Sequence, residues 1–204
     1  MPGQIQINGL FGLVVCGGKS MRMGTDKGFL LYHDKPQCYH LYEMLLPLCE
    51  RVFVSCNNSQ EKKIEPGYST IVDLPDFKDT GPMAGLLSAF DHFPEKSFLM
   101  IGCDYPFLAG IDLLHFINSF DRSEKAAAFY NASAELYEPL LAFYNRQTAE
   151  EILAMHANKD YSLQHYLQKN HAFKFYPRNL KCIESVDTEP EFENALKIIR
   201  QTMH

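Results

Sequence analysis

The sequence predicts an α/β fold with a mostly parallel sheet that is covered by helices on both faces. The first observation is that short apolar runs alternate, along the first half of the chain, with longer amphipathic segments. The second is that several of these runs end in glycine, asparagine or aspartate, at the sheet edge where such folds bind their ligands. The length of 204 residues suits one domain with a core of its own.

In the first half, four apolar runs predict buried parallel strands, over residues 10–16, 51–56, 69–73 and 97–103. Three further segments predict helices, over residues 36–46, 82–93 and 111–120. Pro36 and Pro82 support two of the helix starts, because the first turn of a helix does not need the N–H that proline lacks. A predicted helix separates the first of these strands from the second and the third from the fourth, as the crossovers of a parallel sheet require.

The second half is less regular. Apolar runs predict strands at residues 126–130, 139–144 and 172–176. Helices are expected at residues 148–157, 163–169 and 191–203. The sequence shows no internal repeat, low-complexity tract or linker, so we expect residues 1–204 to form a single domain.

Composition and charge narrow the classes of function. The net charge of −6 argues against non-specific nucleic-acid binding, so no nucleic-acid partner is expected. We see no signal-peptide pattern and no apolar stretch long enough to span a bilayer, so we expect a cytoplasmic protein without membrane contact. The six cysteines form no Cys-x-x-Cys pair, and we expect them to fill small buried positions rather than to form disulfides or a zinc site.

The loop after the first predicted strand suits a polyphosphate. Gly17 and Gly18 leave the strand without side chains, and Arg22 and Lys27 follow within the same loop. Bare backbone N–H groups can approach an anion closely, and the two cations supply countercharge. The glycine spacing fits neither the Rossmann nor the P-loop fingerprint. The alternative is a solvated basic loop, in which Asp26 pairs with a cation or braces the backbone.

Taken whole, this loop resembles the signature of the MobA-type molybdenum cofactor guanylyltransferases. It keeps Gly17-Gly18, Arg22-Met23-Gly24 and Asp26-Lys27, with Val15-Cys16 in place of the family's Leu-Ala. Two more stretches resemble family motifs, namely Gly81-Pro82-Met83-Ala84-Gly85 and Cys103-Asp104-Tyr105-Pro106-Phe107-Leu108. The resemblance extends over nearly the whole chain and is strongest up to about Leu108.

The resemblance implies a Rossmann-like nucleotidyltransferase fold, with a nucleotide half at about residues 9–110 and an acceptor-side half at about 111–204. It implies transfer of GMP from GTP to the terminal phosphate of molybdopterin, with Mg2+ as cofactor and pyrophosphate as product. The attacking phosphate is already anionic, so no general base or covalent nucleophile is required. Transient contact with other proteins of molybdenum cofactor biosynthesis is a further expectation.

The resemblance also implies roles for individual residues. Arg22, Lys27 and Asp104 would be catalytic, with Asp104 holding Mg2+. Nucleotide contacts would come from Val15, Cys16, Gly17, Gly18, Lys27, Asn57, Asp73, Gly85 and Asp104. Each has a plainer alternative: Asp104, Asn57 and Asp73 would be turn residues after strands. Gly85, in turn, would only let its helix pack closely on the sheet.

Two departures from the family pattern fall in the acceptor-side half. Ser185 and Asp187 stand where the family usually has two asparagines, and Glu138 stands where it often has histidine. Other functions therefore stay open. The nearer alternative is a related enzyme with another nucleotide or acceptor, such as a molybdopterin cytidylyltransferase or a sugar-phosphate nucleotidyltransferase. The farther one is a nucleotide-binding protein without catalysis.

Overall fold

The computed structural model describes residues 6–16 and 26–202, and their strands form one seven-stranded sheet. The strands are β1 (Ile7–Val15), β2 (Cys49–Cys56), β3 (Thr70–Val72), β4 (Ser97–Gly102), β5 (Ala126–Asn131), β6 (Leu136–Tyr144) and β7 (Phe173–Phe175). Their order in the sheet is β3-β2-β1-β4-β6-β5-β7. Strand β6 runs antiparallel to both of its neighbours, and the other pairings are parallel. The predicted mostly parallel sheet is thus confirmed.

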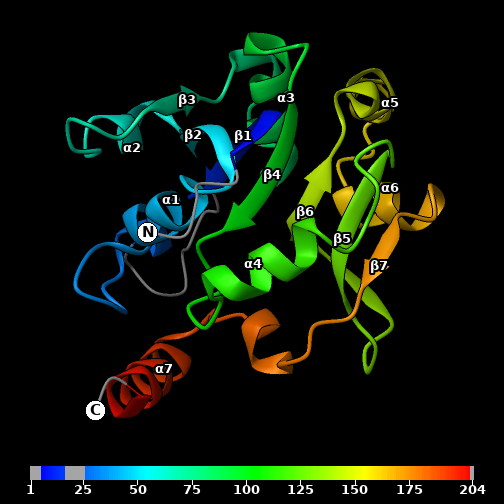
Figure 1. Ribbon diagram of the computed structural model, residues 1–204. Coiled ribbons are helices and arrows are strands. Elements are labelled where there is room, and N and C mark those ends of the chain that lie inside the picture. The colour runs from blue at the N-terminus through cyan, green and yellow to red at the C-terminus, as the bar shows by residue number, and fades with distance from the viewer. Residues whose placement is uncertain (1–5, 17–25, 203–204) are drawn as a thin grey trace.

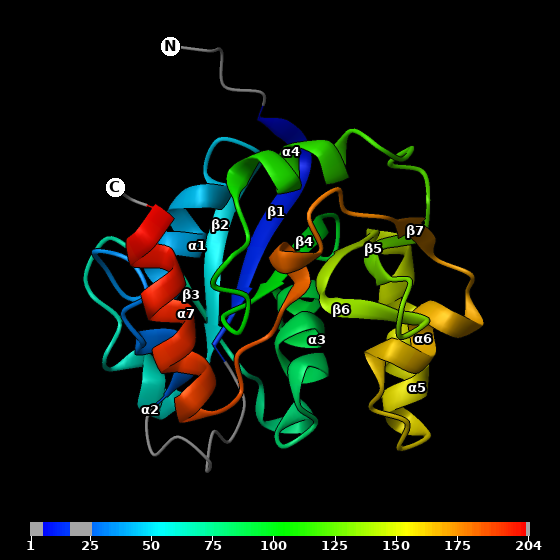
Figure 2. The same cartoon turned by 90° about the horizontal axis from the view of Figure 1, so that it is seen from below.

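Helices cover both faces of this sheet (Figures 1 and 2). They are α1 (Gln37–Leu45), α2 (Asn58–Glu61), α3 (Pro82–His92), α4 (Gly110–Ile117), α5 (Ala149–Ala157), α6 (Leu163–Lys169) and α7 (Glu189–Thr202). Helices α1 and α4 pack on one face, and α3, α5 and α6 pack on the other. The described residues also form four short 3-10 segments, namely η1 (Lys27–Phe29), η2 (Pro75–Phe77), η3 (Arg146–Thr148) and η4 (Leu180–Ile183).

Strand β1 shows how the sequence builds the two-sided core. Leu10 and Val14 contribute to the cluster on the α1 side, whereas Leu13 contributes to the cluster on the α3 side. Such alternation follows from the two-residue period of a strand. Gly12 lies between them, and a Cβ there would come within 3.0 Å of Leu45 Cδ1. Glycine at this point therefore lets α1 approach the sheet closely.

Helix α7 packs apart from the two sheet faces. Its Ala195 and Ile199 form a small buried cluster with Leu30 and Tyr32, which follow η1, and with Val186. Figure 2 shows α7 in front of α1. The last helix is thereby attached through apolar contacts to the segment that follows η1.

All thirteen helices and strands that the sequence predicts are present, with ends that differ by a few residues. Helix α2 and the 3-10 segments were not predicted, because each is about one turn long and shows no periodicity. All six cysteines are buried and free, as small apolar residues would be. Among the helices of the described ranges, none combines the length and apolar character that crossing a membrane requires.

Candidate active site

The carboxyl ends of four parallel strands meet at one edge of the sheet, and most predicted site residues lie there. Main-chain hydrogen bonds join these ends: Cys16 N donates to Ser55 O at 3.2 Å, and Asp73 N donates to Cys56 O at 3.0 Å. Cys103 N donates to Val15 O at 3.2 Å. The structure thus brings together the predicted positions Val15, Cys16, Asn57, Asp73 and Asp104. Gly17, Gly18 and Arg22 lie outside the described residues.

Asp26 braces the segment that carries Lys27. One of its carboxylate oxygens accepts from Gly28 N at 3.2 Å, and the other accepts from Gln60 Nε2 at 2.6 Å. The Gln60 amide also donates to the Cys16 carbonyl at 3.4 Å. Gly28 lies against Cys16, where an added Cβ would be 2.8 Å from the sulfur. Of the two roles that the sequence left open for Asp26, the structure shows the bracing one.

Asn57 is a helix cap rather than a plain turn residue. Its side chain accepts from Ser59 N at 2.9 Å and from Gln60 N at 3.0 Å. The Gln60 side-chain oxygen in turn accepts a hydrogen bond from Asn57 N at 2.9 Å, which completes a capping box at the start of α2. The cap fixes Gln60, and through it Asp26, so Asn57 supports the loop that precedes Lys27.

A close contact between α3 and the sheet forms a second part of the edge. Ser55 Oγ donates to Asp73 Oδ1 at 3.2 Å, and Gly85 in the first turn of α3 lies over this pair. A Cβ at Gly85 would stand 2.2 Å from Ser55 Oγ. Burial raises the pKa of the Asp73 carboxyl, and the Ser55 hydrogen bond partly opposes that shift. The site therefore holds a desolvated acceptor beside bare helix backbone.

Asp104 follows β4 and keeps part of its surface exposed. Burial raises the pKa of its carboxyl, the nearby Lys27 ammonium lowers it, and the Asp187 carboxylate raises it further. The three charges lie near one another, because Lys27 pairs with Asp187 and the adjacent Val186 N–H donates to the Asp104 carbonyl at 2.8 Å. A Cβ at Gly102 would be 2.4 Å from Asp104 Oδ1, so the glycine leaves room for the carboxylate at the strand end.

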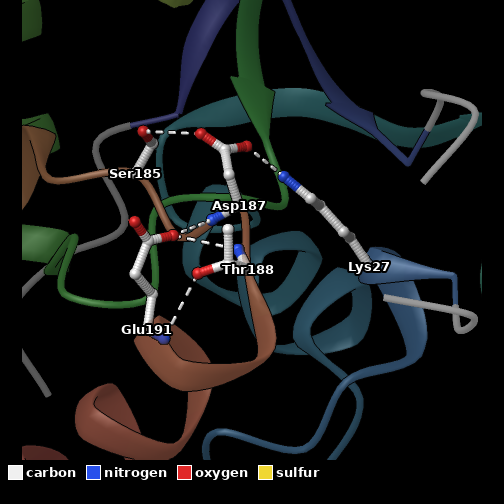
Figure 3. Close-up of polar contacts among 5 residues, drawn as sticks. All are labelled: Lys27, Ser185, Asp187, Thr188 and Glu191. Atoms are coloured by element: carbon white, nitrogen blue, oxygen red, sulfur yellow. Dashed lines mark hydrogen bonds and ion pairs between the residues drawn. The ribbon is translucent and has the colours of Figure 1, made fainter. Parts of the chain in front are cut away.

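The segment before α7 reaches the same place from the far end of the chain (Figure 3). Lys27 forms an ion pair with Asp187, and Ser185 Oγ donates to the other Asp187 oxygen at 3.3 Å. Glu191 Oε2 accepts the N–H groups of Asp187 at 2.8 Å and of Thr188 at 2.9 Å. With Thr188 at the N-cap and Glu191 three residues later, this is a capping box.

The carboxylates at this strand end suit a hard divalent cation, which takes most of its other ligands from water and from the substrate. Asp104 and Asp187 offer carboxylate oxygens, and Mg2+ prefers one or two of these together with phosphate oxygens. Within residues 6–16 and 26–202 there is no group of three or more metal-ligating side chains. The arrangement suits a metal brought with a polyphosphate better than a preformed metal cage.

Glu138 also lies near this edge, on β6. Tyr105 donates its hydroxyl to Glu138 Oε2 at 2.8 Å. Burial raises the pKa of the Glu138 carboxyl, the tyrosine hydrogen bond lowers it, and the Asp104 charge raises it. A negative charge here would repel an anion that approaches Asp104 from the β6 side.

Sequence reasoning missed several supporting residues. Gln60 and Glu191 could have been found, because Asn57 and Thr188 each precede them by three residues in a capping-box pattern. Ser55 gave no signal, since a serine inside an apolar strand is compatible with many environments. Its role depends on α3, which no local pattern places.

One family of known proteins matches most of this chain. A family model described as a MobA-like NTP transferase domain matches residues 12–173. A molybdenum cofactor biosynthesis bifunctional protein of Synechocystis sp. is 34% identical over 136 residues, which are 66% of this chain and 39% of that protein. The chain thus spans well under half of that relative's length.

Another relative is similar over most of its length. A probable molybdenum cofactor guanylyltransferase of Pyrococcus horikoshii is 34% identical over 144 residues, which cover 69% of this chain and 72% of the relative. Among solved structures, the molybdopterin-guanine dinucleotide biosynthesis protein A of Archaeoglobus fulgidus superposes with a TM-score of 0.77 at 21% identity. That match covers 94% of this chain and 99% of the other, and it establishes a shared fold.

Proposed function

This chain belongs to the MobA-like NTP transferase family, and from that premise we propose that it transfers GMP from GTP to the terminal phosphate of molybdopterin. Relatives named as molybdenum cofactor guanylyltransferases support this choice of nucleotide and acceptor. A cytoplasmic location and transient contact with other proteins of the same biosynthesis belong to the proposal.

The observation that carries it is the meeting of Lys27 and Asp104 at the carboxyl ends of the parallel strands. Lys27 pairs with Asp187, and the neighbouring Val186 N–H donates to the Asp104 carbonyl at 2.8 Å, so the cation and the Asp104 carboxylate lie at the same strand end. The Lys27 charge also lowers the pKa of Asp104. A phosphate that reaches Lys27 there would stand beside a carboxylate able to hold Mg2+. That combination suits phosphoryl chemistry, in which positioning and charge stabilisation dominate.

In the proposed reaction, an oxygen of the acceptor's terminal phosphate attacks the α-phosphorus of GTP. The bond from that phosphorus to the oxygen bridging to the β-phosphate breaks, and the leaving electron pair departs with pyrophosphate. Lys27 stabilises the charge that moves onto pyrophosphate, and Arg22 is proposed for the same task. Asp104 would hold Mg2+, which supplies further charge neutralisation when bound. The attacking oxygen is anionic, so the chain needs no general base.

The remaining proposed contacts are divided between the two halves of the chain. Residues 9–110 would bind the nucleotide, with Gly17 and Gly18 at the phosphates or base and with Asp73 and Gly85 at the nucleoside. Gly85 supports this assignment because its bare backbone lies within the strand-end site. Residues 111–204 would face the acceptor.

The decisive experiment incubates the purified protein with Mg2+, molybdopterin and equal concentrations of GTP and CTP. Pyrophosphate release and the mass of the dinucleotide product report activity and nucleotide choice. We expect the guanine dinucleotide.

Gly17→Ala should weaken use of GTP more than use of CTP, by about 1–3 kcal/mol of discrimination, if an added methyl narrows the pocket for a purine. A preference for CTP in the wild type would assign a cytidylyltransferase instead, and nucleotide binding without product would assign a binding protein.

A further inference from the structure

The ammonium group of Lys27 is engaged by Asp187, which lies 160 residues later in the chain (Figure 3). The Lys27 side chain is 20% exposed and the Asp187 side chain is 53% exposed. A ligand can therefore reach both groups from solvent. The pair stands where the proposed function requires Lys27 to meet phosphates.

The position of Asp187 is held by its surroundings rather than by the ion pair alone. Glu191 fixes the Asp187 backbone through the capping box of α7, with an N···O distance of 2.8 Å. Val186 donates its N–H to the Asp104 carbonyl at 2.8 Å, which ties the same segment to the end of β4. Asp187 is thus presented to Lys27 and to the Asp104 site by a braced turn.

Two anions then compete for one cation. A triphosphate that contacts Lys27 must displace Asp187, and the released carboxylate would stand beside the phosphates and repel them. A divalent cation at Asp104 removes that repulsion, because the released carboxylate can turn to the metal. Without nucleotide, Mg2+ gains little from Asp187, because the Asp187 carboxylate is already paired with the Lys27 ammonium.

We propose that Asp187 is an exchangeable internal counterion, which Lys27 releases to Mg2+ as the nucleotide phosphates take its place. The inference rests on the proposed nucleotide site and deepens it. It makes nucleotide and Mg2+ bind cooperatively, and linkage requires that each strengthens the other by the same factor. The alternative is that Asp187 only anchors the turn before α7 and leaves binding unaffected.

The test measures GTP binding by titration calorimetry without acceptor, once in EDTA and once in Mg2+. In EDTA, Asp187→Asn should bind GTP more tightly than the wild type by about two- to fivefold, the range for a partly exposed ion pair. Pyrophosphate, a probe without a base, should show the same gain. The enhancement by Mg2+ should shrink at least about tenfold in the variant, since a carboxamide is a poor ligand for a hard cation.

Two controls separate ion exchange from a general charge effect. Glu189→Gln removes a charge two residues away, on an exposed side chain at the start of α7, and should leave binding in EDTA unchanged. In a Lys27→Met background, Asp187→Asn should improve binding in EDTA by less than it does in the wild-type background, because no ion pair has to be broken and only the repulsion between Asp187 and the phosphates is removed. The wild type should bind Mn2+ weakly in the absence of nucleotide. Electron paramagnetic resonance, which counts the free and bound metal, measures this binding.

Each outcome decides between the alternatives. Equal binding of the wild type and Asp187→Asn in EDTA, an equal gain in Glu189→Gln, or an unchanged Mg2+ enhancement would overturn the exchange while leaving the proposed function intact. Failure of the folded wild type to bind either GTP or pyrophosphate would overturn both. Asp187→Glu provides a second variant, which should retain the Mg2+ enhancement because it retains the carboxylate.

Discussion

Val186 donates its backbone N–H to the carbonyl oxygen of Asp104 at 2.8 Å, which joins the turn before the last helix to the end of the central strand β4. The bond uses main-chain atoms only. A substitution at Asp104 can therefore remove the carboxylate without removing this connection. The chemistry of Asp104 can be separated from its part in the fold.

Asp104→Asn should lower Mg2+-dependent turnover by about 100-fold or more, because the carboxamide binds a hard cation poorly and leaves the phosphate charge less compensated. The melting temperature should not fall, since burial disfavours the charged carboxyl and raises its pKa. Turnover at limiting Mg2+ and thermal unfolding check the two halves of this expectation. Near wild-type turnover under limiting Mg2+ would exclude a metal role.

Lys27→Ala should reduce kcat/KM by about 30- to 1,000-fold, which corresponds to about 2–4 kcal/mol of transition-state stabilisation. Stability should change little, because the Lys27–Asp187 pair is partly exposed. Lys125→Ala is the control, since Lys125 pairs with Glu151 beside the start of β5, at the opposite edge of the sheet. If Lys27→Ala melted early but its folded fraction kept full activity, Lys27 would be structural.

Sequence patterns anticipated the fold better than the site because elements are local and sites are not. Apolar runs and proline-marked helix starts identified each longer element. The order of strands and the reversal of β6 depend on packing between distant segments, which no single run records. Likewise, Lys27 and Asp187 could each be singled out in the sequence, but their pairing follows from the docking of α7 on Leu30 and Tyr32.

Gly85→Ala tests the contact between α3 and the sheet. The new methyl group would stand 2.2 Å from Ser55 Oγ, so Ser55 must leave its hydrogen bond with Asp73 or α3 must shift. We expect a loss of about 1–3 kcal/mol in the free energy of unfolding. The double variant with Ser55→Ala should recover part of that stability. If GTP binding stays weak after stability returns, Gly85 also serves the nucleotide directly.

Asp73→Asn tests the pH dependence that burial imposes. The raised pKa means that folded Asp73 holds its proton more tightly than unfolded Asp73. The wild type therefore loses stability as pH rises from about 3.9, the ordinary carboxyl value, through the folded pKa. The variant lacks this loss and should gain relative to the wild type between acidic and neutral pH. Urea unfolding at several pH values measures the gain, with exposed Asp76→Asn as the control.

Glu191→Gln tests the capping box that presents Asp187. A neutral amide accepts hydrogen bonds from the Asp187 and Thr188 N–H groups more weakly than a carboxylate does. The variant should melt earlier and bind GTP with a weaker response to Mg2+. Thr188→Ala, which removes the N-cap hydroxyl, should cost about 1 kcal/mol of stability. Glu193→Gln, on the exposed side of α7, should change neither property.

The buried free cysteines can report local opening of the fold, because a buried thiol reacts only when it becomes exposed. Cys16 lies beneath Gly28 at the carboxyl ends of the strands, whereas Cys49 begins β2 at the opposite edge of the sheet. Burial raises the pKa of the Cys49 thiol, so both its shielding and its protonation keep it unreactive in the folded chain. A local opening of η1 would uncover Cys16 while Cys49, buried at the start of β2, stays shielded. The order in which a thiol reagent modifies Cys16 and Cys49 thus reports whether η1 opens independently of the rest of the protein.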